Sequence, residues 1–458
     1  MSSWAKSCLV SCLFILCLAN IQTASDAIRI SSGEIGFGAR ALAMGGAYTA
    51  LSNDFSAIYW NPAGLAGIPR GGIFAEGLGT SLLNKITYLG STASVNDYNR
   101  SLGAIGLVSA LPTVRGSFVI GVGINKISSY DDIINFSGFS NVDNELEFKF
   151  IENDELVYHM FNKNVQRSEK IRSVGGVNQI SIGMGVALSP RTTAGLSYSS
   201  VSTQEEYRFI FTQSDSENLY ENFPADFNDY FVTQDLTLEG RASKFRLGLL
   251  TAISPKIKTG INIALPSNFT ITEQHYLEEE LTFDDGSSND STMSGFWDYG
   301  IKTPLSVDGG LAITGSSLTI SVSARFKDWK NTRFNLNNID RGTEIYDDLL
   351  AENRVFSQKY KSTVEFHAGG EYVIRVKGNA VSLRVGYANF PSPLLNSTNR
   401  KKEYATGGIS FSPTKQFIIN LTYLGTSFKR ISSDEYTPSG TIENFTKGTI
   451  VINAMHRF

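Results

Sequence analysis

The dominant pattern along the chain is a strict alternation of apolar and polar side chains over segments of about ten residues. In residues 317–327, every even position from Leu318 to Phe326 is apolar, and the odd positions hold Ser, Thr, Arg or Lys. Residues 179–188 and 244–253 alternate in the same way. Because successive side chains of a strand point to opposite faces, each segment predicts a strand with one apolar and one polar face.

The connections between these segments alternate in length. Short turns such as 189–191, 254–256 and 412–415 join some pairs, whereas the connections between those pairs are long and polar. Strands of about 9–11 residues, with short turns on one side and long loops on the other, are typical of outer-membrane barrels. We expect about fourteen strands, to within two, near 82–95, 101–111, 116–138, 174–188, 191–212, 232–253, 256–280, 298–313, 317–333, 361–375, 379–391, 404–412, 415–430 and 446–458.

The ends of the first strands follow from this count. Residues 112–116 become a periplasmic turn and residues 96–100 the first outer loop, while residues 72–80 belong to the first strand or form a separate one. The predicted fold class is therefore all-β: an antiparallel transmembrane β-barrel of about 14 strands in the bacterial outer membrane, crossing it many times. The alternative is a soluble β-sandwich or propeller, which needs no such asymmetry of turns and loops.

The carboxyl end of the chain supports the barrel. The last strand ends on Phe458, with Ile450, Ile452 and Ala454 on the same face. A terminal aromatic residue on an alternating strand resembles the signal that the barrel assembly machinery recognises, and this makes that machinery an expected partner during biogenesis. His456 departs from the usual apolar residue at its position.

The first 25 residues predict a signal peptide. Lys6 precedes an apolar run over residues 8–19, and small residues then allow cleavage before Asp26 or before Ile28. A lipoprotein site at Cys12 would leave too short an apolar core.

Composition excludes several classes of function. All three cysteines, Cys8, Cys12 and Cys17, lie in the predicted signal, so the mature chain is expected to have no disulfide and no cysteine metal site. A formal net charge of −4 argues against nucleic acid as a partner. The four histidines are scattered, and no G-x-S-x-G, P-loop or Rossmann motif occurs. We expect no enzyme, no cofactor and no metal site.

Residues 26–72, between the signal and the barrel of residues 73–458, differ from the rest of the chain. They contain GARALAMGGAYTAL, with helical character, and DFSAIYWNPAGLAGI, an apolar stretch broken by an Asn-Pro turn. A barrel of about fourteen strands is too wide for its own side chains to fill. We therefore expect a hatch, or plug, inside the lumen. The hatch residues expected to face a hydrophobic ligand are Phe55, Ile58, Tyr59, Trp60, Asn61, Pro62, Ala63 and Leu65.

This segment closely resembles the hatch of the FadL family of outer-membrane transporters for long-chain fatty acids and other hydrophobic compounds. The matching features are the run from Gly38 to Ala50, the pair Asn53 and Asp54, and the N-P-A-G-L turn at 61–65. The resemblance implies that a ligand docks on the outer loops, moves to a pocket beside the hatch, and leaves through a kinked third strand. In this chain that strand is 116–138, and its gating candidates are Gly121, Gly123, Ser128 and Ser129. The alternative is a flexible strand top.

Two outer segments are unusually apolar for loops, 216–231 and 278–297. Exposed apolar patches often mark binding surfaces, so these segments are candidates for the docking groove. The alternative is that their aromatics fold onto the barrel rim or form the interfacial girdle. The docking candidates are Leu219, Tyr220, Phe223, Phe227, Phe231, Phe296 and Trp297. Residues 339–356 predict a loop helix over the barrel mouth, with Ile345 and Leu349 on one face.

Charged residues on the polar faces of strands give further candidates. Arg325, Arg384 and Arg246, with Lys244 and Lys327 beside them, could pair with a fatty-acid carboxylate in the lumen. Alternatively, they pair with other charged residues or with the hatch. The acidic residues of 278–290 could bind calcium, but they do not match an EF-hand loop, so a solvated loop is favoured.

The sequence therefore favours a monomeric outer-membrane protein for passive, hatch-gated transport of long-chain fatty acids or similar hydrophobic compounds, with the outer-membrane lipid around it. Two alternatives stay open. The barrel could be a scaffold that binds secreted or surface proteins as a secretion accessory, or a general diffusion porin.

Overall fold

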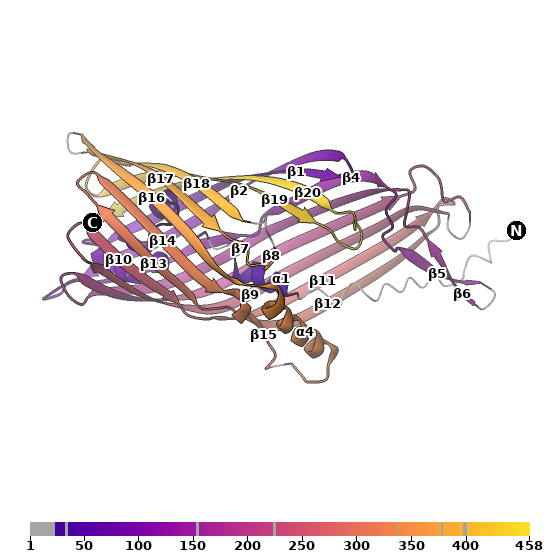
Figure 1. The fold of residues 1–458 in the computed structure, drawn as a ribbon, viewed down its shortest axis with the longest axis horizontal. Coiled ribbons are helices and arrows are strands. Elements are labelled where there is room, and N and C mark those ends of the chain that lie inside the picture. The colour runs from indigo at the N-terminus through magenta and orange to yellow at the C-terminus, as the bar shows by residue number, and fades with distance from the viewer. Residues whose placement is uncertain are drawn as a thin grey trace.

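The chain forms a closed antiparallel barrel (Figure 1). The computed structural model describes residues 23–458 apart from 33–34, 153–154, 223–225, 338, 377–378 and 397–400. Within this part, eighteen strands form one sheet, and the first strand, β1 (Gly72–Tyr88), pairs along its length with the last, β20 (Thr441–Arg457). Residues 1–22, with most of the predicted signal peptide, lie outside the described residues.

Fourteen wall positions result, in agreement with the prediction. In the described residues four positions hold two strands end to end, namely β3 with β4, β10 with β11, β12 with β13, and β14 with β15, and ten strands are uninterrupted. The other bounds are β2 (Ser91–Leu111), β3 (Phe118–Ser129), β4 (Asp132–Ser140), β7 (Val165–Ala187), β8 (Thr192–Ser214), β9 (Phe227–Ala252), β10 (Ile257–Ala264), β11 (Asn268–Phe283), β12 (Ser288–Lys302), β13 (Ser306–Thr314), β14 (Leu318–Asp328), β15 (Arg333–Asn335), β16 (Ser362–Val376), β17 (Asn379–Phe390), β18 (Lys402–Ser412) and β19 (Phe417–Ser432).

The outer face of the barrel carries an apolar belt. On β7 the belt runs over every second residue from Ile180 to Leu188, and Met184 at its centre is 44% exposed. The intervening residues face the lumen, where Ser181 and Gln179 are buried. Since an antiparallel sheet without edges satisfies its backbone within the wall, such a surface is stable in lipid. In the described residues, no helix is long and apolar enough to span a membrane.

The first hairpin differs from the prediction. Residues 96–100 are not an outer loop but part of β2, and residues 72–80 belong to β1. The chain reverses at Leu89 and Gly90, whose φ values of 47° and 87° are both positive. Positive φ at both central residues is the requirement of a type I′ hairpin turn, so two residues suffice and the strands continue outward.

A second predicted loop is also a hairpin. Residues 278–297 lie in β11 and β12, which turn at 284–287. Alternation places Glu279 inside, where the Tyr230 hydroxyl donates to it at 2.8 Å, and leaves Glu278 and Glu280 on the outer face. The three carboxylates therefore do not converge, and among the described residues no group of three or more His, Cys, Asp or Glu is arranged to hold a metal ion.

The N-terminal segment, residues 23–71, lies in the lumen. It forms α1 (Ala24–Ser31), α2 (Ala39–Ala43), α3 (Ala57–Trp60) and the 3-10 helix η2 (Pro62–Gly67). Thr422 of β19 donates to the Ala39 carbonyl at 2.7 Å, and Ser197 of β8 donates to the Ile58 carbonyl at 2.8 Å. Hydrogen bonds to such distant parts of the wall fix the segment across the barrel.

Two elements lie between the wall strands on the outer side. The hairpin β5 (Glu147–Glu152) and β6 (Glu155–Met160) projects at the end opposite the carboxyl terminus (Figure 1). After β14, the short helix η3 (Trp329–Asn331) and β15 lead to α4 (Glu344–Lys359). The predicted helix thus begins and ends later than expected, and it buries Leu349 and Phe356 while Ile345 is 41% exposed.

The belt can be tested by placing a charge at its centre. Met184→Lys is expected to reduce the free energy of unfolding by about 2–4 kcal/mol, as for lysine at the midplane of other barrels. The measurement is a denaturant titration of the barrel folded into vesicles. Thr237→Lys, on the outer face of β9 beyond the belt, is the control, and an equal loss in both variants would contradict the assignment.

Candidate functional site

The Asn-Pro turn anchors the N-terminal segment to the wall. The Asn61 side-chain amide donates to the Thr49 carbonyl at 2.8 Å and to the Leu249 carbonyl of β9 at 3.1 Å. Its Oδ1 accepts from the Ala63 amide at 3.1 Å and so caps η2. A side chain that caps its own helix and binds the wall is a positioning residue.

Lumen-facing glycines let the segment approach the wall closely. A Cβ on Gly195 of β8 would lie 2.2 Å from the Pro62 carbonyl carbon, and one on Gly248 of β9 would lie 2.2 Å from Asn61 Oδ1. On the opposite wall, a Cβ on Gly386 of β17 would lie 2.1 Å from the Gly45 nitrogen. Only glycine permits contacts of this kind.

A chain of ion pairs joins the segment to the wall. Arg40 of α2 binds Glu371 of β16 through two nitrogens, at 2.9 and 2.8 Å. The same carboxylate accepts from Arg384 of β17 at 2.6 Å, and Arg384 also donates to Asn420 at 2.9 Å and to Ser410 at 3.1 Å. Arg384, predicted as a candidate ligand residue, thus shares its carboxylate partner Glu371 with Arg40 of the segment.

Tyr48 extends this network within the segment. The Arg40 guanidinium lies 3.2 Å from the Tyr48 hydroxyl, which in turn donates to Asp54 Oδ2 at 2.7 Å. Burial raises the pKa of the Tyr48 phenol far above its ordinary value, so the hydroxyl stays neutral and keeps its donor proton.

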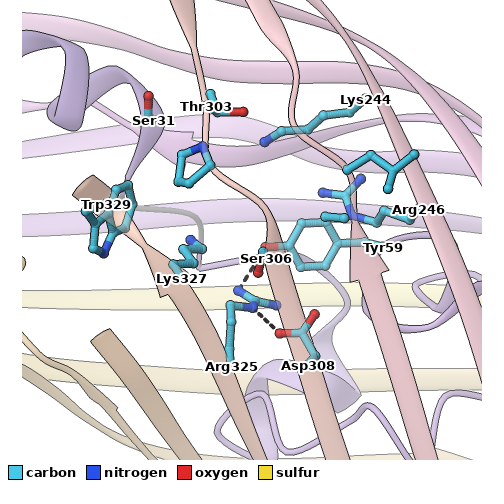
Figure 2. Close-up of a pocket in the computed structure, with 13 residues that line it drawn as sticks. Ser31, Tyr59, Lys244, Arg246, Thr303, Ser306, Asp308, Arg325, Lys327 and Trp329 are labelled. Atoms are coloured by element: carbon cyan, nitrogen blue, oxygen red, sulfur yellow. Dashed lines mark hydrogen bonds and ion pairs between the residues drawn. The ribbon is translucent and has the colours of Figure 1, made fainter. Parts of the chain in front are cut away.

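A cationic cavity lies between the N-terminal segment and the wall strands β9, β10, β13 and β14 (Figure 2). Four cations and one carboxylate line it, together with two aromatic residues. The lining residues are Ser31, Tyr59, Lys244, Arg246, Ala264, Leu265, Thr303, Pro304, Ser306, Asp308, Arg325, Lys327 and Trp329.

Tyr59 is the residue of α3 whose side chain lines this cavity. The Arg246 guanidinium carbon lies 4.6 Å from the ring centroid, and that of Arg325 lies 5.7 Å from it. Arg325 Nε also binds Asp308 at 2.5 Å, and its Nη1 lies 3.6 Å from Glu365. Cation–π contact and ion pairing together fix these guanidinium groups while the pocket remains predominantly cationic.

Lys327 and Trp329 lie next to each other in the lining of the cavity. Lys327 Nζ lies 3.7 Å from Glu365 and 5.1 Å from the centroid of the Trp329 ring. The Trp329 Nε1–H donates to Thr363 Oγ1 at 2.9 Å, so the ring is held in one position. An anionic group with an apolar body fits such a lining, because cations and aromatic surface stand side by side.

The eight predicted ligand residues of the segment are all buried, but they do not share one role. Tyr59 lines the cationic cavity, and Phe55 lines a smaller apolar cavity with Ile68, Phe74, Val108 and Met455 near the periplasmic end. The remaining predicted residues line neither of these two cavities; they are Ile58, Trp60, Asn61, Pro62, Ala63 and Leu65.

The third wall strand is interrupted close to the predicted kink. The register with β7 shifts between Lys126 and Ser128, and Tyr130 and Asp131 separate β3 from β4. Gly121 and Gly123 lie below this point, where a Cβ would meet Ile58 Cδ1 at 3.2 Å or Phe55 Cζ at 2.5 Å. A Cβ on Gly123 would also lie 2.3 Å from the Ile105 carbonyl oxygen of β2, so this glycine allows close approach of both the N-terminal segment and the neighbouring strand.

The predicted docking residues are distributed over several environments. Phe227 is fully buried among loop aromatics, where its ring lies 5.1 Å from Phe161, and the Tyr220 hydroxyl donates to the Lys163 carbonyl at 2.8 Å. Leu219, Phe231 and Phe296 are exposed, at 57%, 41% and 59%. Trp297 packs against the ring of His275 at 4.7 Å, and Phe223 lies outside the described residues.

Several residues of the site were not predicted. Asp308, Glu365 and Glu371 supply the carboxylates that the lumen cations bind, and Trp329 supplies the second aromatic surface. A signal was present in the sequence for one feature only: KFR at 244–246 and RFK at 325–327 each place an aromatic residue between two cations.

Comparison with known proteins identifies the fold. No protein-family profile and no curated protein matches the chain. Among solved structures, the Pseudomonas putida toluene transporter TodX superposes with a TM-score of 0.57 and 14% identity, over 93% of this chain and 99% of TodX. The Ralstonia pickettii toluene transporter TbuX (0.55, 15%, 93% and 99%) and a Pseudomonas aeruginosa FadL homologue (0.55, 11%, 93% and 100%) are similar.

These neighbours are FadL-family transporters, so the resemblance read from residues 38–65 is confirmed at the level of the fold. The chain therefore has the barrel fold of these outer-membrane proteins.

The ion-pair chain predicts how firmly the N-terminal segment is held. Glu371→Gln leaves Arg40 and Arg384 without their carboxylate, and breaking a buried pair typically costs about 3–5 kcal/mol. We expect residues 23–71 to become accessible to protease and the barrel to conduct ions in a planar bilayer. Asp235→Asn, which breaks the exposed Arg208–Asp235 pair at 2.6 Å, is the control; equal behaviour of the two variants would show that Glu371 does not hold the segment.

Proposed function

We propose that this chain carries hydrophobic compounds with an anionic group, above all long-chain fatty acids, across the outer membrane by passive diffusion. The fold supports transport of hydrophobic compounds as the general activity. The single observation that supports an anionic cargo is the cavity in which Lys244, Arg246, Arg325 and Lys327 surround Tyr59 and Trp329.

The carboxylate of a fatty acid suits this cavity chemically. A guanidinium fork binds a carboxylate with two parallel hydrogen bonds, and such charge-assisted bonds are about twice as strong as neutral ones. The apolar chain would lie against the rings of Tyr59 and Trp329. A neutral aromatic hydrocarbon has no negative charge to pair with the four cations and forms only weaker cation–π contacts, so the cargo inferred here differs from the toluene named for TodX and TbuX.

The N-terminal segment acts as the gate in this proposal. Arg40, Asn61 and the lumen glycines hold it against the wall, and Tyr59 couples it directly to the occupied cavity. A carboxylate bound between Arg246 and Arg325 would draw these cations away from the Tyr59 ring and weaken one anchor of the segment. Leu219, Phe231 and Phe296 are the exposed residues on which a cargo would first collect.

The test is uptake of labelled oleate by cells that express the full chain. The double substitution Lys244→Gln with Arg246→Gln removes two cations, and one charge-assisted hydrogen bond to a charged group is worth about 1.5–3 kcal/mol. We therefore expect the apparent KM for oleate to rise about tenfold or more, while permeation of toluene is unchanged.

Lys170→Gln, an exposed cation on β7 far from the cavity, is the matched control. Equal loss of oleate and toluene uptake in the double variant would reject the carboxylate site. If the unaltered protein takes up neither compound but co-purifies with a secreted protein in stoichiometric amount, the scaffold alternative replaces the transporter.

A further inference from the structure

The wall beside the cationic cavity is interrupted in three neighbouring strand positions. Residues 265–267 separate β10 from β11, residues 303–305 separate β12 from β13, and η3 separates β14 from β15. Pro266 and Pro304 occupy the first two interruptions. Proline has no N–H for a ladder and is found in sheets at edges and bulges, so the interruptions are built into the sequence.

Beyond the outer end of the β13–β14 ladder, the interruption leaves a short seam that has no ladder. The paired register ends at Ser306 and Lys327 and resumes only at Lys302 and Arg333. Three residues on one side thus face the five residues 328–332 on the other. The neighbouring seam is closed by one side-chain and one backbone hydrogen bond: Thr303 Oγ1 accepts from the Ser267 amide at 3.0 Å, and the Thr303 amide donates to the Ser267 carbonyl at 2.8 Å.

The two faces of the wall at this seam have opposite character. Leu265, Leu305, Phe245 and Phe326 are on the outer face, where each is 38–43% exposed. The cavity behind them contains the four cations, and both Leu265 and Pro304 belong to its lining. The cavity therefore extends into the interrupted wall, with apolar side chains outside and cations inside.

The seam lies at the outer end of the apolar belt. On β9 the outward residues are apolar from Ile253 to Phe245, apart from Thr251, and become polar with Ser243 and Arg241. On β14 they are apolar up to Phe326 and become polar with Asp328. Since the short turns of a barrel face the periplasm, this end of the belt corresponds to the outer leaflet.

We propose that the seam between β13 and β14 is a lateral opening through which an anionic amphiphile passes between the outer leaflet and the cavity. The carboxylate lies among Lys244, Arg246, Arg325 and Lys327, and the hydrocarbon tail passes between Leu305 and Phe326 into the membrane. This inference rests on the proposed function, and it adds a route and a source for the cargo. The interrupted strand of β3 and β4 is a separate feature, because β7, β8, β9 and the position of β10 and β11 lie between it and the seam.

A disulfide across the seam tests the opening. The predicted mature chain has no cysteine, so Leu305→Cys with Asp328→Cys introduces one pair, at the position where the Ser306–Lys327 register would continue. The matched control is Gly309→Cys with Ala324→Cys, a regularly paired position of the adjoining β13–β14 ladder. Each variant is compared with itself before and after reduction, which cancels any effect of the substitutions alone.

Oxidised Leu305→Cys with Asp328→Cys should take up oleate only at the rate of cells that lack the barrel, and reduction should restore uptake. The control pair should transport equally in both states. Uptake by the oxidised seam variant equal to its reduced form would overturn the proposal. Uptake of oleate by the unaltered protein is measured in parallel. If the unaltered protein takes up no oleate, the proposed function has failed rather than the route.

Photo-cross-linking of the unaltered protein gives a second readout that needs no variant. The probe is a long-chain fatty acid with a diazirine near the middle of its chain, added to vesicles that contain the barrel. Cross-links on residues 264–265, 303–305 or 326–328 are expected. Cross-links confined to β3 and β4 or to the outer loops, or to no residue of the wall, would contradict the lateral opening even if oleate is transported.

Discussion

The absence of water in the hydrocarbon layer is the constraint on which this structure depends. Each backbone N–H and C=O in the membrane must find a partner within the protein, and only helices and closed barrels achieve this. Here β1 pairs with β20 along the entire length of β1 apart from its last residue, so the first and last strands of the described wall leave no open edge between them. The interruption beside Pro304 is the informative exception, because there the Ser267 and Thr303 side chains replace part of the ladder and a cationic cavity lies behind it.

A barrel wall of fourteen strand positions encloses a lumen that its own side chains do not fill. The N-terminal segment occupies this lumen and is held to the wall by two kinds of contact. Glycines such as Gly195 and Gly386 allow backbone-to-backbone approach, while Glu371 joins Arg40 of the segment to Arg384 of the wall. Tyr59 differs from these contacts, because its buried ring faces charged wall residues at the cationic cavity. In the proposed function, this cavity is the place where an anionic cargo acts on the segment.

Much of the architecture could be predicted from the sequence because the membrane imposes a simple code. The alternation from Leu318 to Phe326 determines both faces of a strand, and the run from Gly38 to Ala50 identifies the segment in the lumen. The two-residue turn at Leu89 and Gly90 was not predicted, because leucine rarely adopts a positive φ. The predicted bounds of the first two strands were therefore wrong. Long-range partners such as Arg40 and Glu371, 331 positions apart, follow from barrel closure and have no local signature.

The central claim is that the cavity around Tyr59 holds an anionic amphiphile. Mass spectrometry of the protein extracted from membranes in mild detergent tests it most directly, because a bound cargo is then weighed with the intact barrel. The account predicts a co-purifying lipid with a carboxylate and a long apolar tail, at up to one per barrel, lost from the variant with Lys244→Gln and Arg246→Gln. Recovery of only neutral hydrocarbons, or equal retention of the lipid by that variant, would contradict it.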